Sequence, residues 1–255
     1  MVTFLRSFVF NAAFFGWTAI LGLLYLPLLL APPPAMRAAG AAWARSVLAL
    51  ARALAGIRWE VRGADRVPAG AAILAAKHQS AWDTLFFPAH FGHPALAAKR
   101  ELRWIPFYGW YAWRAGMVWV DRAGRARALR DLVRGARRVL AEGRPLVVFP
   151  QGTRTRPGEA APYQPGIAAL YGATGVPVVP TALNSGLFWG RRAFLKRPGT
   201  IIVEFLEPMP AGLDRDAFLD ELGRRIEAAT RRLEAEGGGG GRPGARARPA
   251  AVCCG

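Results

Sequence analysis

The stretch AAILAAKHQSAWDT, residues 71–84, joins an apolar run to a short polar turn and then to a second apolar segment. The run at 71–76 is short, continuous and apolar, which predicts a strand in a largely buried sheet. The segment at 82–91 is longer and predicts a helix. His78 directly follows the predicted strand, and Asp83 lies where the helix should begin. The stretch therefore predicts a strand, a turn and a helix, with two titratable side chains near the turn.

The same alternation of short apolar runs and helical patterns continues through most of the chain. Strands are expected at 57–62, 71–76, 95–99, 117–120, 146–149, 176–182 and 200–206, and helices at 82–91, 125–142, 167–174 and 216–236. This alternation predicts an α/β sandwich with a largely buried sheet. A chain of 255 residues is long enough for one such domain plus an accessory segment, and nothing requires a second globular domain.

The first 56 residues have the pattern of a membrane-associated helical hairpin. The segment 8–30 has no charged residue and is about long enough to span or enter a bilayer. The segment 36–55 suits an amphipathic helix at a membrane interface, and a helix packed on the following domain explains it equally well. Prolines 32–34 separate the two segments, and Pro27 is expected to bend the last turn of the first. The long apolar run disfavours a cleaved signal peptide.

The charge balance favours partners that carry negative charge. Lys and Arg number 34 against 17 Asp and Glu, a formal net charge of +17. Anionic lipid headgroups, phosphorylated substrates and nucleic acid all fit this excess, and the charge alone does not choose among them. No recognisable nucleic-acid module accompanies it, which disfavours a nucleic-acid binder. Neither a GxGxxG loop nor a Walker loop occurs, so no nucleotide site is predicted.

The C-terminal tail at 237–255 is rich in Gly and Arg and has almost nothing to bury. This composition predicts disorder. The two cysteines, Cys253 and Cys254, are adjacent within the tail, where they can neither cross-link a core nor form a tetrahedral metal site. A bland tail is preferred over a membrane-tethering lipid on this pair. The expected division is therefore a hairpin at 1–56, a catalytic domain at 57–236 and a disordered tail at 237–255.

His78 and Asp83 have the arrangement of a base and the carboxylate that orients it. Asp83 can accept a hydrogen bond from one ring nitrogen of His78, which leaves the other nitrogen free to take a proton. An isolated pair of this spacing is common by chance, so the pair needs support from the rest of the chain. Ser80 lies nearby, but no G-x-S-x-G elbow surrounds it, and the substrate is therefore expected to bring the hydroxyl.

The other two histidines, His90 and His93, form an H-x2-H pattern. No third ligand is evident nearby and Pro94 follows directly, so a loop is preferred and no metal site is predicted.

A second polar turn follows the predicted strand at 146–149, in the stretch VVFPQGTRT at 147–155. Gly152 would let backbone amides approach an anion, and Arg154 offers a two-pronged contact to a phosphate group. A tight turn that carries an exposed arginine is the alternative of about equal weight.

Taken in order, these stretches resemble the PlsC-type 1-acyl-sn-glycerol-3-phosphate acyltransferase family. The blocks are HQSAWD at 78–83, AKRELRWIPFYGW at 98–110, WVDR at 119–122, VVFPQGTRT at 147–155 and GVPVVPTAL at 175–183. The resemblance covers about residues 58–210, and it implies a glycerolipid-acyltransferase-like sandwich around a mixed sheet. It also implies that His78 is the general base and that Asp83 orients it.

The remaining site residues follow from the same resemblance. Arg154, Gly152 and Thr153 correspond to the block that binds the acceptor phosphate, with help from Lys99, while Glu101 belongs to the K-x-E-L block and is expected to position the site. The family usually has glutamate where this chain has Gln151. A glutamine can only orient and form hydrogen bonds, so Gln151 is also expected to act in positioning, and it signals a difference in acceptor headgroup.

The implied reaction is acyl transfer from acyl-CoA or acyl-carrier protein to the sn-2 hydroxyl of 1-acylglycerol 3-phosphate, which makes phosphatidic acid for phospholipid biosynthesis. No bound cofactor or metal is expected. The enzyme is expected at the inner membrane, with its catalytic domain on the cytoplasmic side. The alternatives are acylation of another lysolipid, such as a lyso-ornithine lipid, and a non-catalytic basic protein that binds membranes.

Overall fold

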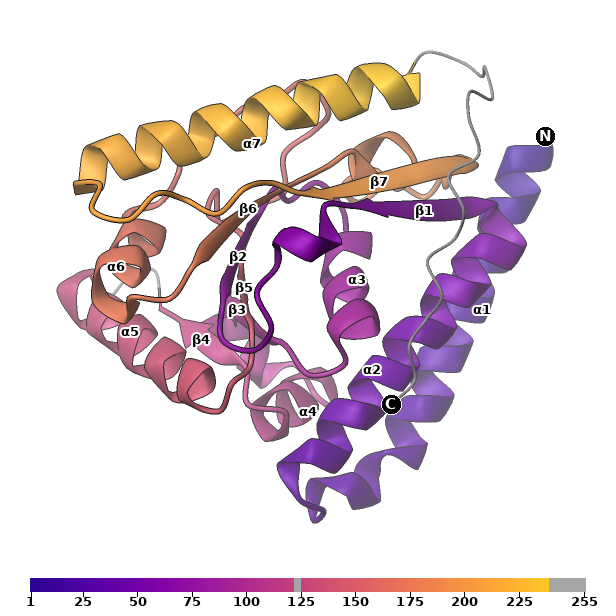
Figure 1. The fold of residues 1–255 in the computed structure, drawn as a ribbon. Coiled ribbons are helices and arrows are strands. Elements are labelled where there is room, and N and C mark those ends of the chain that lie inside the picture. The colour runs from indigo at the N-terminus through magenta and orange to yellow at the C-terminus, as the bar shows by residue number, and fades with distance from the viewer. Residues whose placement is uncertain (122–124, 239–255) are drawn as a thin grey trace.

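The structure is a computed structural model that describes residues 1–121 and 125–238. The fold is built around one seven-stranded sheet (Figure 1). The strand order is β1-β7-β6-β2-β5-β3-β4, and all neighbouring pairs are parallel except the antiparallel pair of β6 and β7. The sheet is therefore mixed, as predicted. The strands are β1 Ile57–Arg62, β2 Ile73–Ala76, β3 Ala95–Lys99, β4 Val118–Val120, β5 Leu146–Val148, β6 Val178–Leu183 and β7 Gly199–Phe205.

Helices cover both faces of the sheet, which confirms the predicted α/β sandwich (Figure 1). Alternate residues of β2 point to opposite sides. Leu74 packs into the cluster that holds α3 and the helix α2, Pro33–Leu50, while Ile73 packs into the cluster that holds α5, α6 and α7. This double burial explains why β2 is an unbroken apolar run. The helices are α3 Trp82–Phe91, α4 Tyr108–Arg114, α5 Arg125–Ala141, α6 Pro165–Thr174 and α7 Arg215–Gly238.

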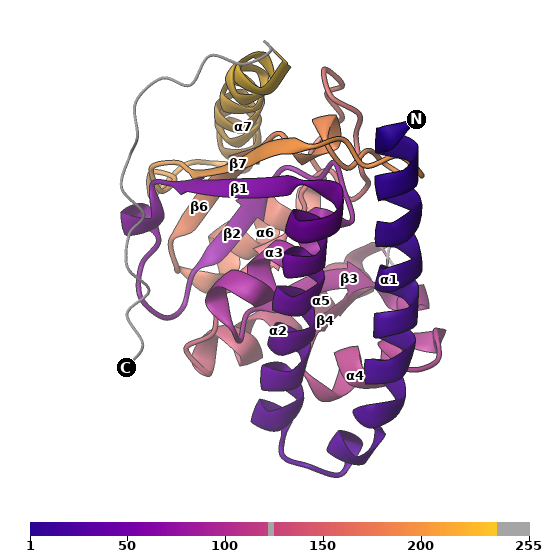
Figure 2. The ribbon, with the colours of Figure 1, turned by 90° about the vertical axis from the view of Figure 1, so that its right-hand side faces the viewer.

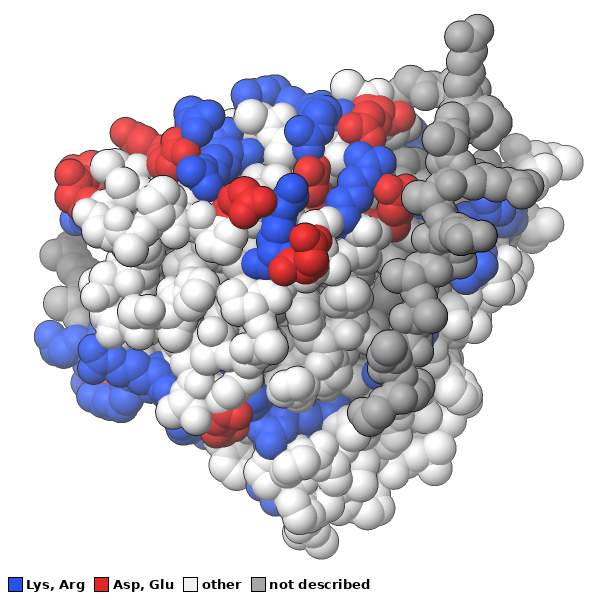
Figure 3. Space-filling view, in the orientation of Figure 1, with Lys and Arg blue, Asp and Glu red and all other residues white. Residues whose placement is uncertain are grey.

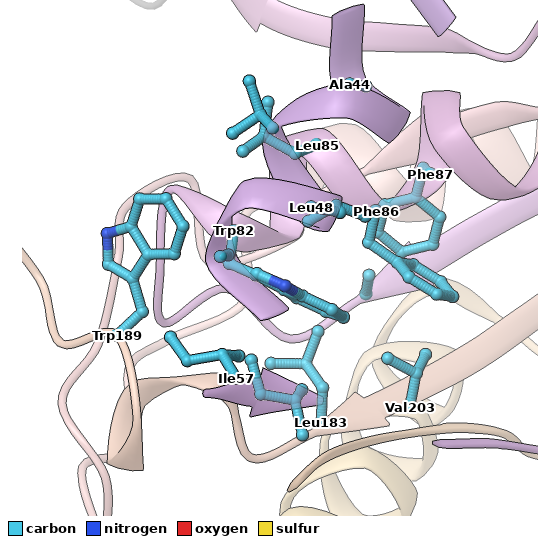
Figure 4. Packing of buried hydrophobic residues seen from close by; sticks show 14 of the residues in the cluster. Ala44, Leu48, Ile57, Trp82, Leu85, Phe86, Phe87, Leu183, Trp189 and Val203 are labelled. Carbon is cyan, nitrogen blue, oxygen red and sulfur yellow. The ribbon is translucent and has the colours of Figure 1, made fainter. Parts of the chain in front are cut away.

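A buried tryptophan fixes the start of α3 against the sheet. Trp82 is fully buried and stacks on Phe86, with ring centroids 5.2 Å apart. Figure 4 shows its indole between α3 and residues of the sheet, among them Leu183. Burying a side chain of this size contributes strongly to stability and permits little movement. Because Asp83 is the next residue, this packing also holds Asp83 in place.

The N-terminal segments form two antiparallel helices that lie side by side along the domain (Figure 2). These are α1 Val2–Leu24 and α2 Pro33–Leu50, joined through a short 3₁₀ turn at Leu26–Leu29, and α2 continues into a π-helical turn at Ala51–Ala55. The expected span 8–30 was wrong at both ends. The helix stops before Pro27 because proline has no N–H to continue the hydrogen-bond ladder.

The hairpin is tied to the catalytic domain rather than separate from it. Phe10 of α1 is fully buried and meets the edge of Trp189, at 5.1 Å between ring centroids. One face of α2 packs on α3 through buried Ala44 and Leu48. The segment 36–55 was expected either to lie at a membrane interface or to pack on the following domain, and this face of it packs on the domain. Truncating the hairpin would therefore expose part of the core.

Most of α1 is nonetheless exposed and apolar. In the described part of the chain, α1 is the one helix long and apolar enough to cross a membrane, and only 11% of its most apolar window is buried. Figure 3 shows few charged side chains over the lower right, where the hairpin lies, whereas Lys, Arg, Asp and Glu gather over α7 and blue side chains over α5. Such an apolar surface is typical of proteins that associate with a membrane.

Candidate active site

The two polar turns meet at one edge of the sheet. His78 follows β2, and the turn at 150–154 follows β5, which pairs with β2 in parallel. On the other side of β2 lies β6, also parallel, and Ser185 follows it. The carboxyl ends of parallel strands lie at the same edge, which is where open α/β sheets place their ligands. Segments more than 100 residues apart in sequence are thereby brought together.

His78 and Asp83 form the predicted pair. His78 Nδ1 lies 2.8 Å from Asp83 Oδ2, and Asp83 is fully buried while His78 is 9% exposed. A carboxylate can only accept, so Nδ1 carries the proton and donates it. This tautomer leaves the lone pair of the ring at Nε2.

Asp83 accepts hydrogen bonds from three donors besides His78. Its Oδ2 also accepts the backbone N–H groups of Gln79, at 2.7 Å, and Ser80, at 2.8 Å. Its Oδ1 accepts the hydroxyl of Ser185 at 2.5 Å. Four donors on one buried carboxylate fix its orientation and compensate for its lost hydration. Ser185 was not predicted, because nothing near it in the sequence marks it as a partner of Asp83.

The imidazole of His78 stacks on an aromatic ring and accepts a hydrogen bond from a guanidinium. The ring of Phe149 stacks on it, with centroids 4.0 Å apart and planes 20° apart. Arg154 Nε lies 3.3 Å from His78 Nε2 and donates to it. The base and the arginine predicted to bind phosphate are therefore direct neighbours.

Arg154 lies in a strongly basic part of the site. Partial burial lowers the pKa of its guanidinium, as do the nearby charges of Arg191 and Arg192, while the carboxylate of Asp83 acts in the opposite direction. Burial raises the pKa of Tyr108, at the start of α4, and the charge of Arg154 opposes that rise. Arg191, Arg192 and Tyr108 were not predicted as site residues.

The turn that carries Arg154 is closed by its own backbone. Gly152 has a φ of +68° and its N–H donates to the carbonyl of Phe149 at 2.8 Å, so glycine suits this position. Thr153 is exposed, and the N–H of Thr155 donates to the carbonyl of His78 at 2.9 Å. This last bond couples the two polar turns directly.

Gln151 faces away from the base and toward α7. Its Nε2 donates to Glu227 Oε1 at 3.1 Å. The same carboxylate accepts from the buried ammonium of Lys77, at 2.8 Å, and from the hydroxyl of Tyr163, at 3.0 Å. Glu227 thus supplies a negative charge beside the neutral amide of Gln151. Gln151 Oε1 is buried and has no hydrogen-bond partner in the described residues.

Lys99 and Glu101 lie at the end of β3 and in the 3₁₀ turn Arg100–Trp104 that follows it. Both are exposed, and in the described residues no hydrogen bond or ion pair joins either to His78 or Arg154. The structure places Lys99 at the same sheet edge as the site, because β3 pairs with β5 in parallel. The two residues are therefore near this edge without belonging to the bonded cluster.

The other two histidines, His90 and His93, lie outside this site. His90, in the last turn of α3, stacks on Phe86 at 5.2 Å, and burial lowers its pKa. The backbone carbonyl of His93 accepts from Arg144 Nε at 2.9 Å. Within residues 1–121 and 125–238, no group of three or more His, Cys, Asp or Glu is placed to hold a metal ion. Cys253 and Cys254 lie outside the described residues, as does most of the predicted tail.

Comparison with known proteins places the chain among acyltransferases. The sequence model of the family described as Acyltransferase matches residues 58–184. The chain is 36% identical to the 1-acyl-sn-glycerol-3-phosphate acyltransferase of Pseudomonas aeruginosa over 186 residues, which cover 73% of this chain and 72% of that protein. It is 31% identical to the 1-acyl-sn-glycerol-3-phosphate acyltransferase alpha of Homo sapiens over 246 residues, which cover 92% of this chain and 85% of that protein.

The fold has a solved counterpart. The crystal structure of the 1-acyl-sn-glycerophosphate acyltransferase PlsC from Thermotoga maritima superposes with a TM-score of 0.72, covering 90% of this chain and 98% of that one, at 21% sequence identity. The fold is therefore shared, and the sequence relationship comes from the closer relatives. From these matches, the chain is an acyltransferase that belongs to the 1-acyl-sn-glycerol-3-phosphate acyltransferase family.

Proposed function

We propose that this enzyme transfers an acyl group from a thioester donor to the sn-2 hydroxyl of 1-acylglycerol 3-phosphate, making phosphatidic acid for phospholipid biosynthesis. The names of the relatives support this acceptor. The observation that carries the proposal is the 3.3 Å contact between His78 Nε2 and Arg154 Nε. A base for a hydroxyl and a cation for a phosphate lie side by side, as an acceptor that carries both groups requires.

In the proposed step, His78 Nε2 removes the proton of the acceptor hydroxyl as its oxygen attacks the thioester carbonyl. The carbon–sulfur bond then breaks, and the departing thiolate takes the proton back from the imidazolium. Asp83 stabilises that imidazolium through the 2.8 Å hydrogen bond at Nδ1. The ester forms without an acyl-enzyme, which agrees with the position of Ser80, whose Oγ accepts the N–H of Trp82 at 3.1 Å.

Arg154 would leave the histidine when the acceptor binds. Its Nε–H occupies the lone pair of His78 that must take the proton. A phosphate dianion is a far stronger acceptor for a guanidinium than a neutral imidazole is. Binding of the acceptor phosphate would therefore draw Arg154 away and free Nε2 for the hydroxyl of the same molecule.

The donor is proposed to be acyl-CoA or acyl-carrier protein. Either thioester carries an already activated acyl group, so the step described here uses no further bound cofactor. The acceptor has a long acyl chain and resides in a bilayer, which fits the exposed apolar surface of α1. Both proposed donors are made in the cytoplasm, and we place the catalytic domain on the cytoplasmic side of the inner membrane.

We further propose that the hairpin enters one leaflet rather than crossing the bilayer. Near one end of α1, Ser7 Oγ accepts the N–H of Lys196 at 2.9 Å. Near the other end, the hydroxyl of Tyr111 donates to the carbonyl of Gly22. A helix of 23 residues is about 34 Å long. Because the catalytic domain contacts α1 along this length, a crossing helix would draw polar parts of the domain into the hydrocarbon.

Adding charge to α1 is expected to release the protein from membranes. Phe15 and Leu24 are exposed on α1, and replacing both with glutamate should weaken binding to anionic phospholipid vesicles by at least about tenfold, because each loses apolar contact and gains a charge that lipid excludes. Vesicle sedimentation measures this. Ala211→Glu makes the same type of change in an exposed turn after β7 and should leave binding unaltered. Unchanged binding of the α1 variant would remove the hairpin as the anchor.

The acceptor can be tested directly. The purified full-length protein is offered several lysolipids, including 1-acylglycerol 3-phosphate and a lyso-ornithine lipid, with acyl-CoA or acyl-carrier protein as donor, and the products are identified by mass spectrometry. Phosphatidic acid as the main product supports the proposal. Exclusive acylation of another lysolipid would replace it with the alternative that Gln151 leaves open.

Arg154→Ala is expected to raise the KM for 1-acylglycerol 3-phosphate by about tenfold or more. A loss of affinity of this size is usual when a hydrogen bond between charged groups is removed. The KM for the donor should change by less than about twofold. Steady-state kinetics with each substrate varied in turn measure both values. Arg156→Ala is the matched control, because Arg156 is exposed two residues further along the same loop. An equal rise in both KM values would remove the phosphate assignment from Arg154.

A further inference from the structure

Two arginines from a distant loop lie beside Arg154. The loop runs from the end of β6 to the start of β7, at residues 184–198, and carries Arg191 and Arg192. Arg191 Nη1 donates to the backbone carbonyl of Arg154 at 3.0 Å. This bond places a second guanidinium group next to the turn that carries Arg154. The loop lies outside the sequence blocks on which the resemblance to the family rests.

The base of this loop is fastened to the catalytic motif. Ser185 bonds to Asp83, and the N–H of Gly186 donates to Gln79 Oε1 at 3.1 Å. A Cβ at Gly186 would lie only 3.0 Å from Pro157 and 3.1 Å from Gln79, so the backbone approaches closely there. The loop therefore starts from a fixed point in the site.

The tip of the loop is also constrained. The N–H of Ala193 donates to the carbonyl of Gly190 at 3.1 Å, closing a turn with Arg191 and Arg192 at its centre. Arg192 has a φ of +56°, which is a costly conformation for a residue other than glycine. Further along, the N–H of Arg197 donates to the carbonyl of Phe188 at 2.8 Å. Arg191 is thus presented by an ordered turn rather than by a free chain end.

The positive charges in this part of the site have too few negative partners. Asp83 is the acidic residue that acts on Arg154, and it is buried and already bonded to His78. Two acidic residues of α7 that bond to the catalytic turns already have partners there, Glu227 on Lys77 and Glu234 on Gln79. Arg191 and Arg192 are exposed, and neither is a member of the ion pairs among the described residues. Like charges held this close are relieved by an anionic ligand.

We propose that Arg191 binds the phosphomonoester of the acceptor together with Arg154, and that this second guanidinium selects dianionic monoesters over monoanionic diesters. This proposal rests on the proposed function, because it takes 1-acylglycerol 3-phosphate as the acceptor. Two guanidinium groups match the two charges of a monoester, whereas a diester carries one. The two arginines, Arg154 and Arg191, thereby distinguish acceptors by the charge of the headgroup, which apolar contacts with the acyl chain cannot do.

The test compares two acceptors with the same oleoyl chain, 1-oleoylglycerol 3-phosphate and 1-oleoylglycerophosphoglycerol, using full-length protein and a fixed acyl donor. Arg191→Gln should raise the KM for the monoester by about tenfold, leave the KM for the diester within about twofold, and change kcat little. Arg191→Lys should recover part of the loss, because it keeps the charge but not the planar fork. Arg197→Gln removes an exposed arginine from the same loop and should change neither KM.

The other outcomes are separable. If the unaltered enzyme acylates the monoester but Arg191→Gln leaves its KM unchanged, the inference fails and the proposed function stands. A rise in the KM for the donor alone would overturn the inference by assigning Arg191 to the phosphates of CoA or the acidic surface of acyl-carrier protein. If the unaltered enzyme does not acylate the monoester, the proposed function and this inference both fail. Thermal unfolding of each variant shows whether a kinetic change reflects loss of fold.

Discussion

His78→Ala is expected to lower kcat by about a thousandfold, within the range that a general base contributes, while the protein stays folded and bound to membranes. The proposed mechanism has one proton acceptor for the substrate hydroxyl, His78 Nε2. No other imidazole lies in the described site, because His90 packs among aromatic rings and the carbonyl of His93 bonds to Arg144. Initial rates at saturating concentrations of both substrates measure the loss.

Two variants make this result specific. His93→Ala removes an exposed histidine outside the site and should retain full activity. His78→Gln keeps a polar side chain against Phe149 but cannot take a proton, so it should be as inactive as His78→Ala. Turnover within about tenfold of the unaltered enzyme in either His78 variant would exclude the base assignment, since a general base contributes at least about a hundredfold.

The central strands could be predicted because burial on both faces leaves a continuous apolar run, which β2 shows clearly. Element ends were less well predicted, because they depend on single groups: Pro27 ends α1, although the apolar composition continues to Leu30. The short helix α4 was missed. Its aromatic sequence has no helical periodicity, and hydrogen bonds from Tyr111 to Gly22 and from Arg114 Nε to Leu29 hold it against the hairpin.

For the site, sequence reasoning could find residues whose partners are close in the chain. His78 and Asp83 are five residues apart and lie on either side of one turn. Ser185 is 102 residues from Asp83, and the two meet because β6 pairs with β2. Arg191 depends in the same way on the path of a loop. Lys77 did carry a local signal, since a lysine directly after a buried strand needs a partner, but Glu227 lies 150 residues away.

Asp83→Asn is expected to lower kcat by about 10³- to 10⁴-fold with little loss of stability, as the corresponding change does in serine-protease triads. The amide oxygen can take the place of Oδ2 and keep the bonds from His78, Gln79 and Ser80. The amide nitrogen then faces Ser185, whose hydroxyl can turn and accept. Only the hydroxyl proton of buried Ser185 loses its acceptor, so the variant should still fold. The negative charge that stabilises the imidazolium is lost, and the rate falls.

Ser185→Ala separates the charge of Asp83 from its orientation. This variant keeps the carboxylate and removes one of its donors, so kcat should fall by about tenfold, far less than in Asp83→Asn. Measuring kcat and the melting temperature of both variants tests the assignment. If Asp83→Asn retained activity close to that of Ser185→Ala, the carboxylate would act by orientation alone. The loss in Asp83→Asn must instead exceed that in Ser185→Ala by at least about a hundredfold, because a neutral amide can hold the imidazole in place but cannot balance the charge that develops on it.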